Sequence, residues 1–161
     1  MINLIINDFD MSISAKVEYG LRAILEISQS DGLLKARELS KRMNIPLKFL
    51  AHIINDLSVA GITMSKTGAR GGVSLARDPG QISLKDIIEA LEGPFKLLKC
   101  DAIRNWCGFT ENCPIKNELM DVEQKVEGIL ESKKISDFLY LKEKTKRKGE
   151  YYGNNRKINN Q

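Results

Sequence analysis

The sequence of 161 residues predicts a mainly α-helical protein with one small β-hairpin and one long helix near its C-terminus. Three observations lead to this fold class. Apolar residues recur at helical spacing in four stretches before residue 93. A glycine-rich turn joins two short stretches in which apolar and polar residues alternate. Beyond residue 114, apolar residues follow a heptad pattern.

The composition places the chain among soluble proteins. Hydrophobic residues make up 42% of it and charged residues 29%, with a net charge of +4 and a pI near 8.9. The N-terminus has no basic region and no small-residue cleavage site, so it does not resemble a signal peptide. No apolar run approaches the roughly 18 residues of a membrane span. Three cysteines cannot form a complete disulfide framework. We therefore expect a cytoplasmic protein without membrane contact.

Three helices are predicted first. The first runs from Ser14 toward Asp31-Gly32 and places Val17, Leu21 and Ile24 on one face. The second covers residues 36–43. The third covers residues 46–60, with Pro46 in its first turn, an apolar face of Leu47, Leu50, Ile54 and Leu57, and Gly61 at its end. Helix, tight turn, helix is the helix-turn-helix pattern.

A β-hairpin follows directly. Residues 62–66 and 73–76 alternate, and the glycine-rich turn 67–72 joins them. A hairpin in this position predicts the wing of a winged helix-turn-helix, which is a DNA-binding domain. Arg70 lies between glycines at the tip, where it is able to reach a minor groove.

The remaining chain divides into a short helix, a cysteine loop and a long helix. Ser83, followed by Asp86, predicts the N-cap of a helix that ends at Gly93-Pro94. The heptad stripe beyond Pro114 is narrow and must be buried, which predicts that two chains pair as a homodimer; it consists of Ile115, Leu119, Val122, Val126 and Ile129.

These assignments give five segments. We expect an N-terminal extension at 1–11 and the winged helix-turn-helix DNA-binding domain at 12–94. A cysteine loop at 95–114 and a dimerisation helix region at 115–141 follow. Residues 142–161 form a basic tail that we expect to be disordered.

Polar residues opposite the apolar stripe of the third helix are candidates for contact with double-stranded DNA. Lys48, His52 and Asn55 share this face, and Asn reads adenine bidentately in the major groove. Basic residues around this face would neutralise phosphates; these are Lys41, Arg42, Lys66 and Arg70. A solvated helix face is the plain alternative for Lys48, His52 and Asn55 in isolation, and the order of the elements favours DNA binding for the whole unit.

All three cysteines fall within fourteen residues, at Cys100, Cys107 and Cys113. Thiolates select zinc, copper(I) or iron–sulfur clusters. The gaps of six and five residues do not fit a structural zinc site, and three thiols are one ligand short of a cluster. His52 is already assigned to DNA, so a fourth ligand must come from elsewhere. Ordinary reduced thiols and a metal-free thiol switch remain alternatives.

Together these residues resemble the Rrf2 family of bacterial winged-helix regulators, in its cluster-binding branch of the IscR, NsrR and RirA kind. The resemblance covers residues 12–141 and is carried by the cysteine loop and by SAKVEYGLRA (14–23), ARELS (36–40), IPLKFL (45–50), GARGG (68–72) and ISLKDIIEA (82–90). It implies a homodimeric transcription factor, a repressor rather than an enzyme, whose DNA affinity follows the state of a bound cluster.

The resemblance also implies a ligand set. The cluster, 2Fe-2S or 4Fe-4S, would be bound by Cys100, Cys107 and Cys113. Some members add a histidine three residues after the third cysteine, a position occupied here by Lys116. Others add a carboxylate from the first helix of the other chain, a position that matches Glu18. Glu18 is equally readable as a solvated carboxylate. Iron–sulfur assembly proteins are then expected partners, and an iron–sulfur carrier or a cluster-free thiol regulator are the alternatives.

Overall fold

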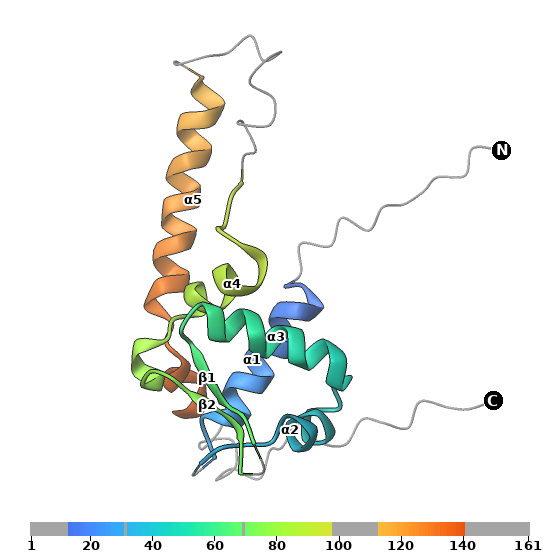
Figure 1. The fold of residues 1–161 in the computed structure, drawn as a ribbon. Helices are drawn as coiled ribbons and strands as arrows, with labels where there is room; N and C mark the ends of the chain where they lie inside the picture. The colour runs from blue at the N-terminus through green and yellow to red at the C-terminus, as the bar shows by residue number, and fades with distance from the viewer. Residues whose placement is uncertain (1–12, 31, 69, 98–112, 141–161) are drawn as a thin grey trace, which may run out of the picture.

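The computed structural model describes residues 13–30, 32–68, 70–97 and 113–140. The expected extension 1–11, the basic tail 142–161, Cys100 and Cys107 lie outside these ranges. The elements are helices and one two-stranded hairpin (Figure 1): α1 (Ala15–Ile27), α2 (Ala36–Met43), α3 (Leu47–Val59), β1 (Thr63–Lys66), β2 (Gly72–Leu75), the 3-10 helix η1 (Pro79–Gln81), α4 (Leu84–Glu92) and α5 (Pro114–Ser132). Residues 135–140 are also helical. This order and the antiparallel hairpin confirm the predicted fold class.

Local capping explains where several helices begin and end. The Ser14 hydroxyl accepts a hydrogen bond from the Val17 amide at 3.2 Å and starts α1. Ser83 and Asp86 form the complete capping box of α4, as predicted. Asn44 ends α2 in the left-handed conformation, at φ 52°. Pro46 is the N-cap of α3, one position earlier than its expected place in the first turn.

The hairpin is anchored to the body of the domain. Leu34, in the segment before α2, bridges to Val73 of β2 through two backbone hydrogen bonds of 2.9 Å. A Cβ at Gly72 would lie 2.9 Å from the Leu34 carbonyl oxygen, so this close approach requires glycine. A Cβ at Gly71 would lie 2.2 Å from the Lys66 carbonyl oxygen. Glycine at these two positions therefore allows the hairpin backbone to lie close to Leu34 and to the end of β1.

Two adjoining clusters of buried side chains form the core, and α1 contributes to both. Val17 and Ile24 belong to one cluster, and Ala23 and Ile27 belong to the other. Ile135, in the helical residues 135–140 that follow α5, is fully buried in the first cluster. The end of the segment assigned to dimerisation therefore packs into the DNA-binding domain. Leu47 is 40% exposed, and its expected place on the buried stripe of α3 is wrong, because the helix turns this first residue outward.

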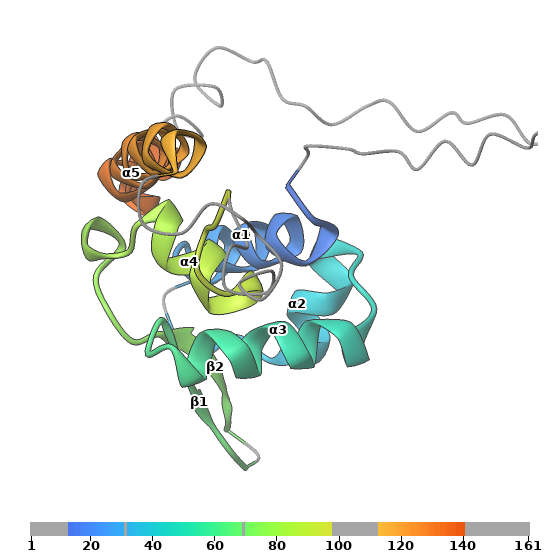
Figure 2. The same ribbon diagram turned by 90° about the horizontal axis from the view of Figure 1, so that it is seen from above.

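The long helix α5 rises away from the body of the molecule along most of its length (Figures 1 and 2). No residue of α5 is buried, and its heptad positions Ile115, Val122 and Ile129 are 60%, 44% and 61% exposed. The stripe predicted to be buried is thus open to solvent in one chain. Within the described residues, no helix is long and apolar enough to cross a membrane.

Helices α1 and α4 meet at Gly20, and this contact generates a stability prediction. A Cβ at Gly20 would lie 2.4 Å from Cδ1 of Leu91, which is 4% exposed. Overpacking costs about 1–3 kcal/mol, whereas alanine gains roughly 1 kcal/mol over glycine in a helix. We expect Gly20→Ala to lower the free energy of unfolding by up to about 2 kcal/mol in urea titrations. In a Leu91→Ala background the substitution should cost less; an equal cost in both backgrounds would contradict the clash.

Candidate nucleic-acid interface

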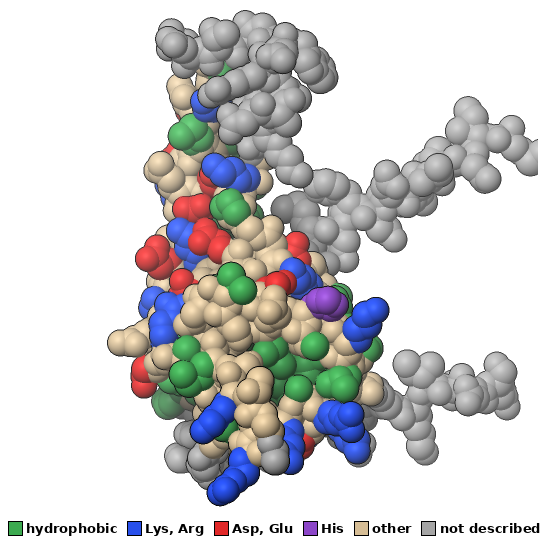
Figure 3. Space-filling view, in the orientation of Figure 1, with side chains coloured by type: hydrophobic (Ala, Val, Ile, Leu, Met, Phe, Trp, Pro, Cys, Tyr) green, Lys and Arg blue, Asp and Glu red, His purple; other side chains and the backbone are tan. Residues whose placement is uncertain are grey.

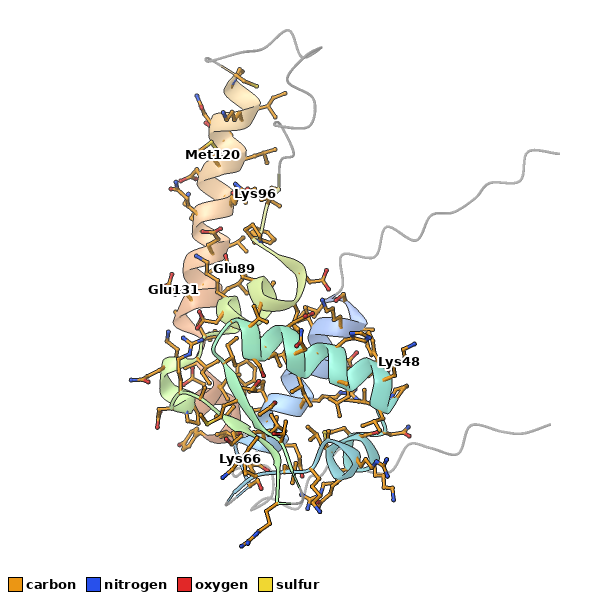
Figure 4. The ribbon with its side chains drawn as sticks, in the orientation of Figure 1. Lys48, Lys66, Glu89, Lys96, Met120 and Glu131 are labelled. Atoms are coloured by element: carbon orange, nitrogen blue, oxygen red, sulfur yellow. The ribbon has the colours of Figure 1, made fainter. Side chains whose placement is uncertain are left out.

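The outward face of α3 carries the residues expected to read bases. Lys48, His52 and Asn55 are all exposed, while Ile53 and Leu57 behind them are fully buried. Figure 4 shows Lys48 projecting from the N-terminal end of α3, away from the core. The spacing of three and four residues keeps the polar side chains on one face. The structure therefore brings the three together on an accessible helix.

The wing supplies the second expected surface. Lys66 at the end of β1 pairs in register with Gly72, and its side chain is exposed on the hairpin (Figure 4). Arg70 is also exposed and lies within the turn between the strands. The antiparallel register places both residues at the same end of the ribbon, so Arg70 is the outermost of the expected contacts.

Unpaired cations gather on the surface formed by α2, α3 and the hairpin. Within the described residues, the basic side chains of this surface have no carboxylate partner; they are Lys35, Arg37, Lys41, Lys48, Lys66 and Arg70. Among the other described lysines, Lys16, Lys85 and Lys125 are paired with acids, whereas Lys96, Lys116, Lys133 and Lys134 are not. In Figure 3 the lower part of the molecule shows blue side chains with little red beside them, whereas blue and red side chains are mixed along α5 and near α4. A surface of cations with few acids beside it suits a polyanionic partner.

Arg42 has a different environment from the other basic candidates. Its guanidinium donates to Glu26 at 2.8 Å and to Glu38 at 2.5 Å. The hydrogen bond that Arg42 donates to Glu26 is the largest cause that raises the pKa of Arg42, followed by the one it donates to Glu38. Arg42 thus ties α2 to α1, and a phosphate contact by this side chain would have to compete with two carboxylates. The pair with Glu38 is predictable from the sequence, because the two residues are four positions apart on one helix. The pair with Glu26 is not, because Glu26 belongs to a different helix.

A hollow of about 410 Å³ lies between α2, α3 and the hairpin. Its lining includes side chains that the sequence did not single out, notably Lys35 and Arg37. Lys35 is the N-cap of α2 and Arg37 lies in its first turn, so no helical repeat in the sequence points to these two residues. The full lining is Lys35, Ala36, Arg37, Ile54, Ser65, Lys66, Gly68, Gly71, Gly72 and Val73.

Of the candidate cluster ligands, Cys113 and Glu18 lie within the described residues. Cys113 is half-buried at the N-cap of α5 and forms no disulfide there. Glu18 is exposed in the first turn of α1 and forms an ion pair with Arg22. The described part of the chain contains no cluster of three His, Cys, Asp or Glu residues able to hold a metal.

Both ends of the cysteine segment are held against α5. Before it, the Leu97 amide donates to Glu123 of α5 at 2.9 Å; after it, Cys113 starts the same helix. These two attachment points lie ten residues apart on α5, which corresponds to roughly 15 Å of helix. The described residues that border positions 98–112 on either side therefore both lie at α5.

Lys16 connects the end of α4 to α3. Its ammonium group donates to the Leu91 carbonyl oxygen at 2.5 Å and forms an ion pair with Asp56 of α3 at 2.9 Å. Nearby, the Ser14 hydroxyl donates to Glu92 at 2.7 Å. Lys16 is half-buried because its side chain spans these two elements. The start of α1 thus holds α4 and α3 in a fixed relation.

Comparison with known proteins identifies close relatives of this arrangement. Residues 13–140 match the Rrf2 family model, described as an iron-dependent transcriptional regulator. An Aquifex aeolicus (strain VF5) protein, named as an HTH-type transcriptional regulator, is 31% identical over 83% of this chain and 95% of its own length. CymR of Bacillus subtilis (strain 168) is 28% identical over 79% of this chain and 88% of its own.

Solved structures show the same fold. The structure of CymR, the global cysteine regulator of B. subtilis, matches 82% of this chain and 98% of its own, with a TM-score of 0.63 and 27% identity. IscR of T. potens matches 84% of this chain and 90% of its own, with a TM-score of 0.66 and 28% identity.

Arg70 gives the first test of the interface. We expect Arg70→Ala to weaken specific DNA binding by about 1–3 kcal/mol, because the variant loses a charged contact at a groove. Binding is measured by fluorescence anisotropy on a site selected from a randomised duplex library. Lys96→Ala, which removes one charge beside α5 (Figure 4), is the control and should bind as the wild type does. Equal affinities for all three proteins would remove the role assigned to the wing.

Proposed function

The chain belongs to the Rrf2 family of DNA-binding transcriptional regulators, and from this premise we propose that it is a homodimeric repressor controlled by an iron–sulfur cluster. The observation that carries the proposal is the joining of two features in one chain. An exposed cationic surface covers α2, α3 and the wing, and a segment with every cysteine of the chain is attached to α5. The family consists of transcriptional regulators rather than enzymes.

In this proposal, α3 enters the major groove and the wing reaches the neighbouring minor groove. Lys48, His52 and Asn55 face the base edges, and Arg70 extends along the wing. Lys66 and Lys41 neutralise phosphates, and Arg42 holds α2 against α1 while lying next to them. Two such domains related by a two-fold axis require two half-sites about one helical turn or more apart.

Dimerisation is assigned to α5. Rrf2 regulators typically act as dimers. The exposed apolar positions Ile115, Val122 and Ile129 recur every seven residues, which is the repeat of a helix that packs along a second helix. A helix with no buried residue gains its stability from such packing. We therefore place the two-fold axis along α5.

A variant of α5 tests this assignment. We expect Val122→Lys to raise the dissociation constant of the dimer at least about 100-fold, because burial of an unpaired charge costs several kcal/mol. Sedimentation equilibrium measures the change. Gln124→Lys adds the same charge on another face of α5 and should remain dimeric. If Val122→Lys pairs as tightly as Gln124→Lys does, the stripe is not the interface.

The cluster is assigned to Cys100, Cys107 and Cys113, with Glu18 of the partner subunit as the fourth ligand. Three thiolates suit a 2Fe-2S or 4Fe-4S cluster, which would make DNA affinity depend on cluster or iron status, nitric oxide or redox state. Cys113 fits this role because its thiol is partly accessible at the start of α5. Glu18 fits because it is exposed, and among the described residues its carboxylate is bound to Arg22 alone, in a surface pair that can be released at low cost.

The ligand set is tested on protein purified without oxygen. We expect iron and acid-labile sulfide in equal amounts, with visible absorbance, and the amount per chain distinguishes 2Fe-2S from 4Fe-4S. Cys107→Ala should contain no iron yet keep the helical far-ultraviolet spectrum, since both described core clusters lie outside the cysteine segment.

The fourth ligand has its own matched pair of variants. Glu18→Gln and Arg22→Gln both break the ion pair between these residues, but only Glu18→Gln removes the carboxylate. We expect the cluster of Glu18→Gln to be lost faster in air than that of Arg22→Gln. Equal lifetimes would exclude Glu18.

A cluster-free thiol regulator is the second candidate. It is favoured by the similarity to CymR, a cysteine regulator in B. subtilis, and by a cysteine gap of six residues in the segment. Oxidation of two neighbouring thiols to a disulfide would then replace cluster loss as the switch. Colourless protein that takes up no iron on reconstitution but changes its DNA affinity with thiol oxidation would establish this alternative.

A further inference from the structure

We propose that the hollow between α2, α3 and the hairpin is the seat of a DNA phosphodiester, and that Lys35 and Arg37 are the residues that hold it. This inference rests on the proposed DNA-binding function and adds a backbone site to it. The ligand chemistry is that of a singly charged phosphate in a nucleic-acid chain, and the two residues belong to neither the base-reading face of α3 nor the tip of the wing.

The position of the hollow follows from the geometry of a duplex. Major and minor grooves lie side by side, with the sugar-phosphate backbone of one strand between them. A protein that places α3 in the major groove and Arg70 in the adjoining minor groove must straddle that strand. The hollow of about 410 Å³ lies between these two elements and is lined by both of them, as well as by α2. The hollow therefore faces the sugar-phosphate backbone of one DNA strand.

The lining matches a phosphate and its sugar in shape and in polarity. Ile54 and Val73, 7% and 2% exposed, provide an apolar floor for the sugar. Gly71 and Gly72 present bare backbone, so no side chain blocks a close approach from the hairpin side. The hydroxyl group of Ser65 lines the hollow and is able to donate a hydrogen bond to a phosphate oxygen.

The charge of the lining favours an anion. Lys35, Arg37 and Lys66 line the hollow, and no carboxylate does. None of the three has an acidic partner within the described residues, in contrast to Arg42 one helical turn further on. Three unneutralised cations around one concavity repel each other until an anion enters.

The test is the salt dependence of DNA binding by the full-length protein. Lys35→Gln and Arg37→Gln each remove one charge from the hollow, and Lys96→Gln removes one charge beside α5 (Figure 4). Affinity is measured by anisotropy between about 50 and 200 mM salt. The probes are the operator selected from a randomised library and an unrelated duplex of equal length. Far-ultraviolet circular dichroism confirms that each variant is folded.

Loss of one phosphate contact lowers the slope of log affinity against log salt by about 0.9. We expect Lys35→Gln and Arg37→Gln to show this reduction at each half-site, and Lys96→Gln to keep the wild-type slope. The ratio of operator affinity to unrelated-duplex affinity should change less than about twofold, because a phosphate contact carries no sequence information. This pattern establishes the phosphate seat.

Three results would overturn the inference. Wild-type slopes in both hollow variants would show that no phosphate sits there. A large fall in the operator ratio would assign the two residues to base recognition instead. Tight binding of inorganic phosphate to the free protein, lost in Arg37→Gln, would make the hollow a site for a small anion. Wild-type protein that selects no operator would refute the proposed function itself, which is distinct from these three results.

Discussion

The close contact of α1 with α4 at Gly20 is the constraint on which the rest of the fold depends. Because Gly20 has no side chain, Leu91 enters the space beside α1 and joins a core cluster with Val17 and Ile24. The adjoining part of the same buried face of α1 packs Ala23 and Ile27 into the second cluster, with α2 and the base of the wing. One helix therefore sets the positions of all the elements that carry the cationic surface.

The charged residues are arranged so that carboxylates do not neutralise the cationic surface of α2, α3 and the hairpin. Several carboxylates on the helices are paired with cations: Glu26 and Glu38 hold Arg42, and Glu127 holds Lys85. The hydrogen bond to Glu127 is the largest cause that raises the pKa of Lys85. Surface pairs of this kind add little stability individually. Their effect here is to remove competing negative charge, so that the net positive charge of the chain acts where α3, the hairpin and the first turn of α2 face outward.

Interactions between residues that are close in the sequence could be predicted, whereas interactions between distant segments of the chain could not. Ser83 and Asp86 predict their capping box because both partners lie within one turn. The burial of Ile135, the half-buried position of Lys16 and the pair between Arg42 and Glu26 depend on residues brought from distant parts of the chain. Lys35 and Arg37 had no sequence signal for the same reason. Only the bridge between Leu34 and Val73 brings the wing beside them.

The contacts of Lys16 bear on how a signal in the cysteine segment would reach DNA. Control of affinity requires that two states of the segment make different contacts with an element that also positions the DNA-reading surface. The last turn of α4 meets this requirement. It leads into the segment through Leu97, and its Leu91 carbonyl oxygen shares the Lys16 ammonium group with Asp56 of α3. Lys16 therefore forms a direct polar connection between the last turn of α4 and α3, at the point where Leu91 packs against Gly20 of α1.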